Sequence, residues 1–331
     1  MAASAIVVGI GSYPKFGKDG ASPNDLHGAV EDAKAVTKWL LEVAKAEVTL
    51  ITSDGFNGKA WTFDHILPIR PIGADLNAAF DPFAKSNAPA MGDRLYVYVA
   101  GHGLAPNPRT RCLITAEAQL PLVPNLEVPA WIDWFTTQTR FDELVLWMDC
   151  CGTQALDYTP TKPTGLANVA SRAGQPARVF MAFASGFGRD SYEGPIGPGG
   201  EMRGLFTARL LKGLEGGAAD DNGEVRSALL ANFLRNGSLN AAGGEAQFAM
   251  VPHEDDMVFA ANQPHPIYRI RVQVADGTDM LLTSPPGPLS KAAKVKDGWV
   301  SFALGVGLYK LKGGGLERIF EIGATTPADI E

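Results

Sequence analysis

Short apolar runs alternate with amphipathic stretches along the first 235 residues of this chain. Short, mainly apolar runs, typical of strands buried on both faces, occur at residues 5–10, 48–51, 94–100, 144–148 and 179–184. Helical spacing of apolar residues occurs between and after them, at residues 26–40, 72–86, 129–139, 204–214 and 225–234. Strands that alternate with helices predict an α/β fold: a mostly parallel sheet flanked by helices on both faces.

The pattern changes after residue 262. Short segments of alternating apolar and polar residues, separated by Gly, Pro and Asp, cover residues 267–274, 279–283, 299–304, 308–311 and 318–322. They predict a small antiparallel, all-β, sandwich-like module. We therefore expect two domains, residues 1–262 and residues 266–331.

Several local features are expected from turn-forming residues. Asn24 or Asp25 is positioned to cap the first helix. The stretches 156–176 and 185–203 are rich in Gly, Pro or Thr and lack periodicity, so we expect loops there. A short hairpin strand is expected at residues 112–115.

Composition narrows the class of protein. The 331 residues include 46% hydrophobic and 20% charged residues, with a formal net charge of −7, which is ordinary for a folded soluble protein. No basic stripe, 18-residue apolar run or positively charged leader is present, so we expect neither nucleic acid nor membrane as a partner. Three cysteines, two of them adjacent, fit a reducing compartment, and we predict a cytoplasmic protein.

Two strand ends carry candidate chemistry. His102 follows the strand at 94–100 and lies between Gly101 and Gly103, and Cys151 follows the strand at 144–148. Parallel neighbours would bring both side chains to the same edge of the sheet, where α/β proteins bind their ligands. A thiol needs a base to become a nucleophile, and His102 can supply it. The alternative interpretation is that Cys151 is an inert core cysteine.

The residues around these strand ends resemble the caspase/metacaspase superfamily of cysteine proteases, in its bacterial branch. The segments that carry the resemblance are residues 5–10 with 26–33, residues 98–103, residues 148–152 and residues 204–214. The 49-residue spacing of His102 and Cys151 also matches caspases. The resemblance implies a caspase-like cysteine endopeptidase that hydrolyses protein substrates with a His102/Cys151 dyad. It further implies a regulated bacterial pathway, such as antiphage defence or cell death.

The family pattern Asp-x-Cys selects Cys151 as the nucleophile, with Cys150 in the variable middle position. The sequence departs from metacaspases after this point, because Gly152 and Thr153 replace the usual His and Ser. We expect the backbone N–H groups of Gly103 and Cys151 to stabilise the oxyanion, since glycine allows the substrate carbonyl to approach.

Substrate preference follows from two acids that match metacaspase pocket positions, Asp32 and Asp149. Two carboxylates at the floor of a pocket favour a guanidinium or ammonium group, so we predict cleavage after Arg or Lys. The alternatives are that Asp32 only caps or solvates its helix, and that Asp149 only orients its loop. Cleavage of the chain's own loops at Lys162, Arg172, Arg189 or Arg203 is a further hypothesis.

We predict no cofactor and no metal site. The cysteines lack a zinc spacing, and residues 220–224 lack a complete calcium loop. Because some metacaspases need calcium, the resemblance leaves calcium dependence open. Gly307 and Tyr309 resemble the strand start of immunoglobulin-like or carboxypeptidase-regulatory-like modules. We find no catalytic constellation in this module and expect it either to dock on the protease domain or to bind a regulatory partner protein.

Two other function classes compete with a protease. One is a catalytically silent caspase-fold adaptor that acts by protein binding, against which the His102/Cys151 pair argues. The other is a non-proteolytic hydrolase or nucleotide-binding domain, which fails because the Gly-x-Ser-x-Gly elbow and the phosphate loop are missing.

Overall fold

The computed structural model describes residues 2–17, 24–61, 65–84, 92–138, 141–163, 176–196, 200–220, 222–235, 249–251, 257–284, 290–305, 307–322 and 326–331. The chain forms two compact units, Met1–Ala208 with Leu239–Asp255, and Arg209–Ser238 with Asp256–Glu331. The boundary between them falls inside a helix, well before the predicted domain boundary. The division into domains at residues 262–266 therefore stays a prediction.

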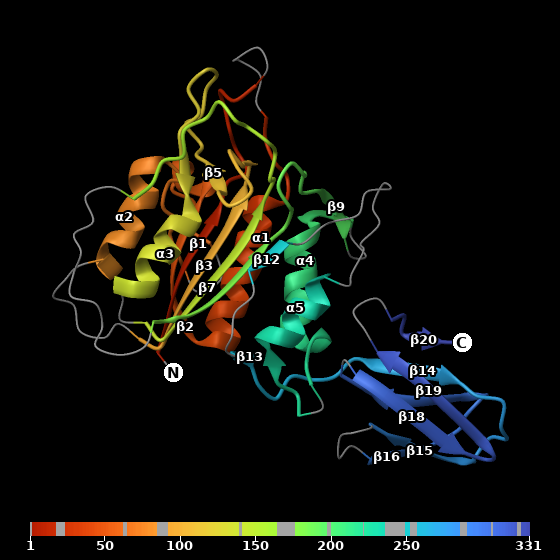
Figure 1. Cartoon of the computed structure of the whole chain (residues 1–331). Coiled ribbons are helices and arrows are strands. Elements are labelled where there is room, and N and C mark those ends of the chain that lie inside the picture. Colours follow the sequence, from red (N-terminus) through yellow and green to blue (C-terminus); the bar gives the residue numbers. More distant parts are fainter. Residues whose placement is uncertain are drawn as a thin grey trace. The chain divides into compact units, whose positions relative to one another are not determined.

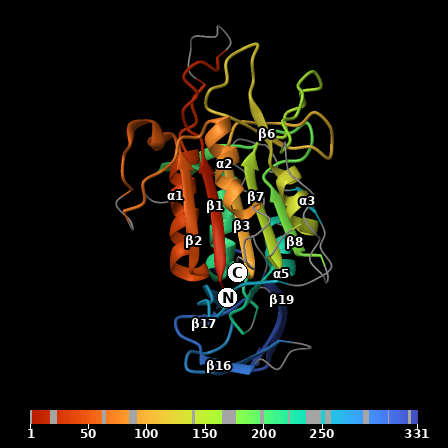
Figure 2. The same cartoon turned by 90° about the vertical axis from the view of Figure 1, so that its left-hand side faces the viewer.

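The first unit is built on a six-stranded sheet of order β12-β8-β7-β3-β1-β2. Figure 2 shows β2, β1, β3, β7 and β8 side by side. Their bounds are Ala3–Gly9 (β1), Ala46–Thr52 (β2), Arg94–Gly101 (β3), Glu143–Cys150 (β7), Arg178–Phe183 (β8) and Ala249–Val251 (β12). The first five are parallel and β12 is antiparallel to β8, which confirms the predicted α/β class.

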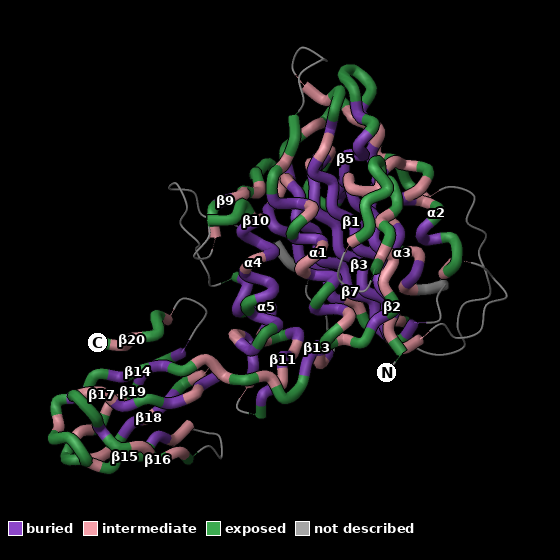
Figure 3. The backbone as a smooth tube through the Cα atoms, turned by 180° about the vertical axis from the view of Figure 1, so that it is seen from behind, coloured by how far each residue is buried: buried purple, intermediate pink, exposed green. Residues whose placement is uncertain are grey.

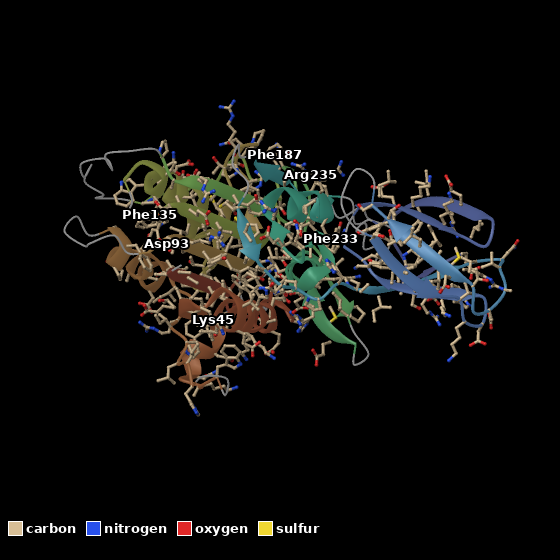
Figure 4. All side chains as sticks on the ribbon, turned by 90° about the horizontal axis from the view of Figure 1, so that it is seen from below. Lys45, Asp93, Phe135, Phe187, Phe233 and Arg235 are labelled. Carbon is tan, nitrogen blue, oxygen red and sulfur yellow. The ribbon has the colours of Figure 1, made fainter. Side chains whose placement is uncertain are left out.

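Helices cover both faces of this sheet. Helix α1 (Ala29–Trp39) lies on one face, and α2 (Gly73–Ala84) and α3 (Val128–Gln138) lie on the other (Figure 1). On the α2/α3 face, Phe80 stacks on Trp131 with ring centroids 4.5 Å apart, and Phe135, labelled in Figure 4, lies beside both rings. On the α1 face, Trp39 meets the rings of Tyr96 and Trp147.

Strand alternation decides which residues face which layer. The core between the sheet and α2/α3 takes Leu95, Val97 and Val99 from β3, and Leu144, Leu146, Met148 and Cys150 from β7. The intervening residues point to the α1 face, because successive side chains of a strand point to opposite faces. The central strands are buried along their length (Figure 3). Cys150 is therefore a core residue, and Asp149 faces the α1 side.

The start of α1 corrects the predicted cap. The helix begins after Gly28, and no side chain of Asn24 or Asp25 caps it. Instead, the carboxylate of Glu193, from a distant segment, accepts the backbone N–H groups of His27 at 3.0 Å and Gly28 at 2.8 Å. After Trp39 the helix continues as a π-helical turn, Leu40–Ala44.

The predicted loop at residues 185–203 is also partly wrong. It contains a short antiparallel pair, β9 (Glu193–Ile196) and β10 (Glu201–Gly204). Residues 164–175 of the other predicted loop lie outside the described residues, and residues 156–163 contain neither helix nor strand. The predicted hairpin strand is β5 (Cys112–Ile114), which lies between β4 (Gly103–Leu104) and β6 (Asn125–Glu127).

Helix α4 (Leu205–Lys212) joins the two units, and a π-helical turn at Gly213–Gly217 follows it. In the second unit, strands β11 (Val225–Arg226) and β13 (Val258–Ala260) form an antiparallel pair beside helix α5 (Ser227–Arg235). The Arg209 guanidinium donates to the Phe233 carbonyl and lies 4.5 Å from the ring centroid of Phe233, labelled in Figure 4.

The C-terminal part of the second unit is a small β-sandwich. One sheet has the order β17-β14-β20 and the other β16-β15-β18-β19. A single core joins the two sheets, with Ile270 and Phe302 from one and Met280, Leu311 and Tyr309 from the other. This confirms the predicted all-β module. Its strands are β14 (Ile267–Arg271), β15 (Asp279–Thr283), β16 (Ser290–Lys294), β17 (Trp299–Ala303), β18 (Gly307–Gly313), β19 (Leu316–Ile322) and β20 (Asp329–Ile330).

Candidate active site

His102 and Cys151 lie side by side at the carboxyl edge of the sheet. Strands β3 and β7 pair in parallel with Ala100 opposite Asp149 and Gly101 opposite Cys150. His102 and Cys151 are each the next residue, so the register brings them to neighbouring positions. Both line one pocket of about 290 Å³, together with residues of α1 and of the segment that leads into β9.

The imidazole of His102 is held by a backbone carbonyl and two aromatic rings. Its Nε2 lies 2.7 Å from the carbonyl oxygen of Asn24. Because a carbonyl oxygen only accepts hydrogen bonds, Nε2 carries the proton and Nδ1 is the basic nitrogen of the neutral ring. The rings of Tyr13 and Phe16 lie 4.7 and 5.8 Å from the imidazole centroid. Burial lowers the pKa of His102, and the bond to Asn24 opposes this shift.

The Cys151 thiol opens onto the pocket, whereas Cys150 does not. The backbone N–H of Ser191 donates to Cys151 Sγ at 3.2 Å. Burial raises the pKa of Cys151, and the Ser191 N–H opposes this by stabilising the thiolate. Cys150 is buried in the core, where burial and the Asp149 charge raise its pKa well above the usual range.

The turn that carries Cys151 is held by hydrogen bonds from Ser185, a residue that follows β8. The Ser185 hydroxyl accepts the Gly152 N–H at 2.7 Å and donates to the Cys150 carbonyl at 3.2 Å. Gly103, the predicted oxyanion glycine, packs against the same turn. A Cβ there would come within 2.4 Å of the Cys151 carbonyl oxygen. Among the described residues that line the pocket, Gly101 and His102 are present but Gly103 is not.

Asp149 is a buried and fully engaged carboxylate that lines the pocket. Its Oδ1 accepts from the Ser191 hydroxyl at 2.9 Å. Its Oδ2 accepts from the Thr207 hydroxyl at 2.7 Å and from the Thr207 N–H at 3.2 Å. Burial raises the pKa of Asp149, and these three hydrogen bonds oppose the rise. The side chain therefore orients the residues around it as well as facing the pocket.

Asp32 lies next to Asp149 and already has a cationic partner. Arg203 Nε donates to Asp32 Oδ1 at 2.5 Å, and the Gly204 N–H donates to Oδ2 at 2.6 Å. Burial and the Asp149 charge nevertheless raise the pKa of Asp32 to about 7. Gly204 separates the two acids, since a Cβ at this position would lie 2.3 Å from Asp149 Oδ2 and 2.8 Å from Asp32 Oδ2.

Several site residues were not identified from the sequence. Two more carboxylates, Asp190 and Glu193, line the pocket, and Ser191 lies between them. They belong to residues 185–203, which were expected to form a loop, and no alternation of apolar and polar residues in this stretch indicated that their side chains face a pocket. Tyr13 and Asn24 were missed because their role depends on contacts with His102, about 80 to 90 residues away.

The described residues contain no group of three or more His, Cys, Asp and Glu side chains able to hold a metal ion. No helix in the part of the chain that the structure describes is long and apolar enough to cross a membrane.

The architecture is that of a caspase-like α/β domain followed by a small β-sandwich. A family model described as the caspase domain, Peptidase C14, matches residues 2–235, so the chain belongs to this peptidase family. No curated protein sequence matches the chain.

Two crystal structures are similar to it. One is of a Geobacter sulfurreducens protein, with 12% identity and a TM-score of 0.45, covering 76% of this chain and 93% of that one. The other is of caspase-1 from Spodoptera frugiperda, with 14% identity and a TM-score of 0.46, covering 75% and 85%.

The three thiols are expected to differ in reactivity. Only a thiolate attacks iodoacetamide. Cys151 alone among the three is partly exposed, and its sulfur receives the Ser191 N–H, whereas Cys112 and Cys150 are buried. We expect Cys151 to be alkylated about tenfold faster or more than the other two, with a rate that rises with pH. Peptide mapping by mass spectrometry over time measures this. The Cys151→Ala chain should lose the fast phase, and equally fast labelling of Cys150 would contradict the assignment.

Proposed function

We propose that this chain is a caspase-like cysteine endopeptidase in which Cys151 is the nucleophile and His102 the general base. The observation that supports this most directly is the shared pocket: an imidazole and a thiol come from in-register ends of adjacent parallel strands and line the same cavity. The caspase domain match over residues 2–235 supports the same reaction class.

The proton transfers follow from the environment of the two groups. The pKa of Cys151 is raised and that of His102 is lowered, which favours a neutral thiol beside a neutral imidazole at rest. His102 Nδ1 then takes the thiol proton as sulfur attacks the substrate carbonyl carbon, and it returns this proton to the leaving amine. Water hydrolyses the resulting thioester and regenerates the thiol. The N–H of Ser191 stabilises charge on the sulfur during these steps.

The tetrahedral oxyanion requires two donors near Cys151. We retain the backbone N–H groups of Gly103 and Cys151 for this role, because Gly103 lies against the Cys150–Cys151 backbone.

The charge of the pocket supports cleavage after Arg or Lys. Four carboxylates line it, Asp32, Asp149, Asp190 and Glu193, and no Lys or Arg occurs among the described lining residues. Arg203 neutralises part of the charge on Asp32, whereas Asp149, Asp190 and Glu193 form no ion pair with any residue that the structure describes. A substrate guanidinium or ammonium group can form charge-assisted hydrogen bonds with them.

The wider role rests on resemblance. We retain as hypotheses a regulated bacterial pathway, such as antiphage defence or cell death, and binding of a regulatory protein by the C-terminal β-sandwich. The alternative function, a silent caspase-fold adaptor, shares the fold but predicts no hydrolysis.

Hydrolysis of fluorogenic peptides tests the dyad. We expect cleavage of P1 Arg or Lys peptides, and loss of at least about 10³-fold in kcat for Cys151→Ala and His102→Ala, since each removes a reacting group. The matched control is Cys150→Ala, which removes the neighbouring buried thiol and should retain activity near that of the unmodified chain.

Circular dichroism would establish that the variants are folded. Activity that persists in Cys151→Ala, or that is lost only in Cys150→Ala, would contradict the proposed dyad. A folded, unmodified chain that cleaves none of the peptides would favour the adaptor.

Substrate preference is tested by removing one pocket charge at a time. We expect Asp149→Asn to raise KM for P1 Arg peptides about tenfold or more, because a guanidinium loses a charged acceptor. The effect on peptides with a neutral P1 residue should be much smaller. Glu31→Gln, which removes an exposed carboxylate beside Asp32 on α1, is the matched control and should change neither value. An equal loss for charged and neutral P1 residues would exclude a role in recognition.

The pH dependence of binding tests the role of Asp32. Its pKa of about 7 means that it is mostly protonated at pH 6 and mostly ionised at pH 8. A bound cation favours the ionised form, so affinity for a P1 Arg peptide should rise about tenfold between these pH values and then level off. Calorimetry on the Cys151→Ala chain measures binding without hydrolysis. Asp32→Asn should flatten the dependence, and an unchanged slope in that variant would assign the titration to another group.

A further inference from the structure

The ring of Tyr13 packs against the imidazole of His102, the histidine of the proposed dyad. Tyr13 follows β1, is fully buried, and its ring lies 4.7 Å from the imidazole of His102. Its hydroxyl accepts the backbone N–H of His102 at 2.9 Å and donates to the carbonyl of Ile114 at 3.3 Å. The N–H of Ile114 in turn donates to the carbonyl of His102 at 2.8 Å. These three hydrogen bonds form a closed ring that fixes both backbone groups of His102.

The sequence around Tyr13 is adapted to this contact. A Cβ on Gly101 would lie 2.6 Å from the Tyr13 hydroxyl oxygen, so only glycine at this position lets the hydroxyl reach the His102 amide. Tyr13 itself is held by Asp25, whose carboxylate accepts the Tyr13 N–H at 2.7 Å. The neighbouring Asn24 provides the carbonyl that receives His102 Nε2–H. Tyr13 therefore restrains the backbone of His102, and the adjoining segment Asn24–Asp25 restrains its ring and holds Tyr13 in place.

We propose that Tyr13 is a positioning residue for His102, and that its hydroxyl sets the direction in which the imidazole presents Nδ1 to Cys151. This inference rests on the proposed peptidase function. Buried tyrosine hydroxyls usually have a hydrogen-bond partner, but here that partner is the backbone amide of the proposed base itself. Tyr96 provides the contrast: it is equally buried, on β3, but its hydroxyl receives a hydrogen bond from Arg94, at the opposite end of the strand.

Tyr13→Phe tests the proposal, because it keeps the ring and removes only the oxygen. The His102 N–H then loses the hydroxyl that fixes its direction, and we expect kcat to fall about tenfold while KM stays within about twofold. Water that enters to replace the hydroxyl would solvate the imidazolium, so the pKa of His102 should rise toward its ordinary value. The acidic limb of the pH–rate profile should move up accordingly. The other ionisable groups near the imidazole, Asp25, Glu193 and Cys151, are unchanged in this variant.

Two further variants separate positioning from general stability. Tyr96→Phe also removes a buried hydroxyl and should lower the melting temperature without moving the pH profile. Gly101→Ala should reproduce the effect of Tyr13→Phe, because its Cβ displaces the hydroxyl. Equal kcat values and identical pH profiles for Tyr13→Phe and Tyr96→Phe would overturn the proposal.

A readout independent of hydrolysis distinguishes failure of this inference from failure of the proposed function. The chain has five histidines, so the ring resonance of His102 can be assigned by its disappearance in His102→Gln. An upward shift of its titration in Tyr13→Phe, and none in Tyr96→Phe, is the expected result. An unmoved titration overturns the role of Tyr13 even where the unmodified chain cleaves peptides. Absence of any cleavage by that chain refutes the peptidase proposal, while the titration still decides the role of Tyr13.

Discussion

The parallel pairing of β3 with β7 is the constraint on which the rest of the site depends. Arg94 pairs with Glu143 at one end and Gly101 with Cys150 at the other, without a shift of register between them. His102 and Cys151 leave the sheet at the same level for this reason alone. A slip of one residue would also turn every side chain of the slipped strand to the opposite face. Cys150 would then leave the core and Asp149 would enter it.

The same alternation explains why two adjacent cysteines differ. Cys150 joins the apolar layer beneath α2 and α3, where its thiol has no access to the pocket. Asp149, one residue earlier, faces α1 and approaches Asp32 on that helix. These positions could be predicted from the sequence, because an apolar run that ends at a polar residue indicates both a buried strand and the point where it reaches the edge of the sheet. The fold class, the sandwich and the strand ends carrying His102 and Cys151 were therefore predictable.

The sequence did not predict what surrounds the strand ends, and the reason is physical. Strands β9 and β10 are four residues long and rich in Gly and Pro, so neither alternation nor propensity marks them. The turn before α1 is held by Glu193, 165 residues from Gly28, and neither the nearby Asn24 nor Asp25 caps the helix. Capping rules consider only residues close in sequence, so they could not predict a contact between Glu193 and the backbone of His27 and Gly28. The catalytic roles of His102, Cys151 and Gly103 and the substrate-binding roles of Asp32 and Asp149 remain predictions.

The acidic pocket poses an energetic problem that the fold solves locally. Two buried carboxylates side by side lose hydration and also repel each other, which is why the pKa of Asp32 rises to about 7. Asp149 is stabilised by three donors from Ser191 and Thr207, and Asp32 by Arg203 and the Gly204 N–H. These donors orient the two carboxylates but balance only part of the negative charge that the carboxylates bring to the pocket. A site that keeps unbalanced negative charge next to a thiol would be best complemented by a cation on the substrate itself, which is the physical argument behind the proposed preference for Arg or Lys at the cleavage position.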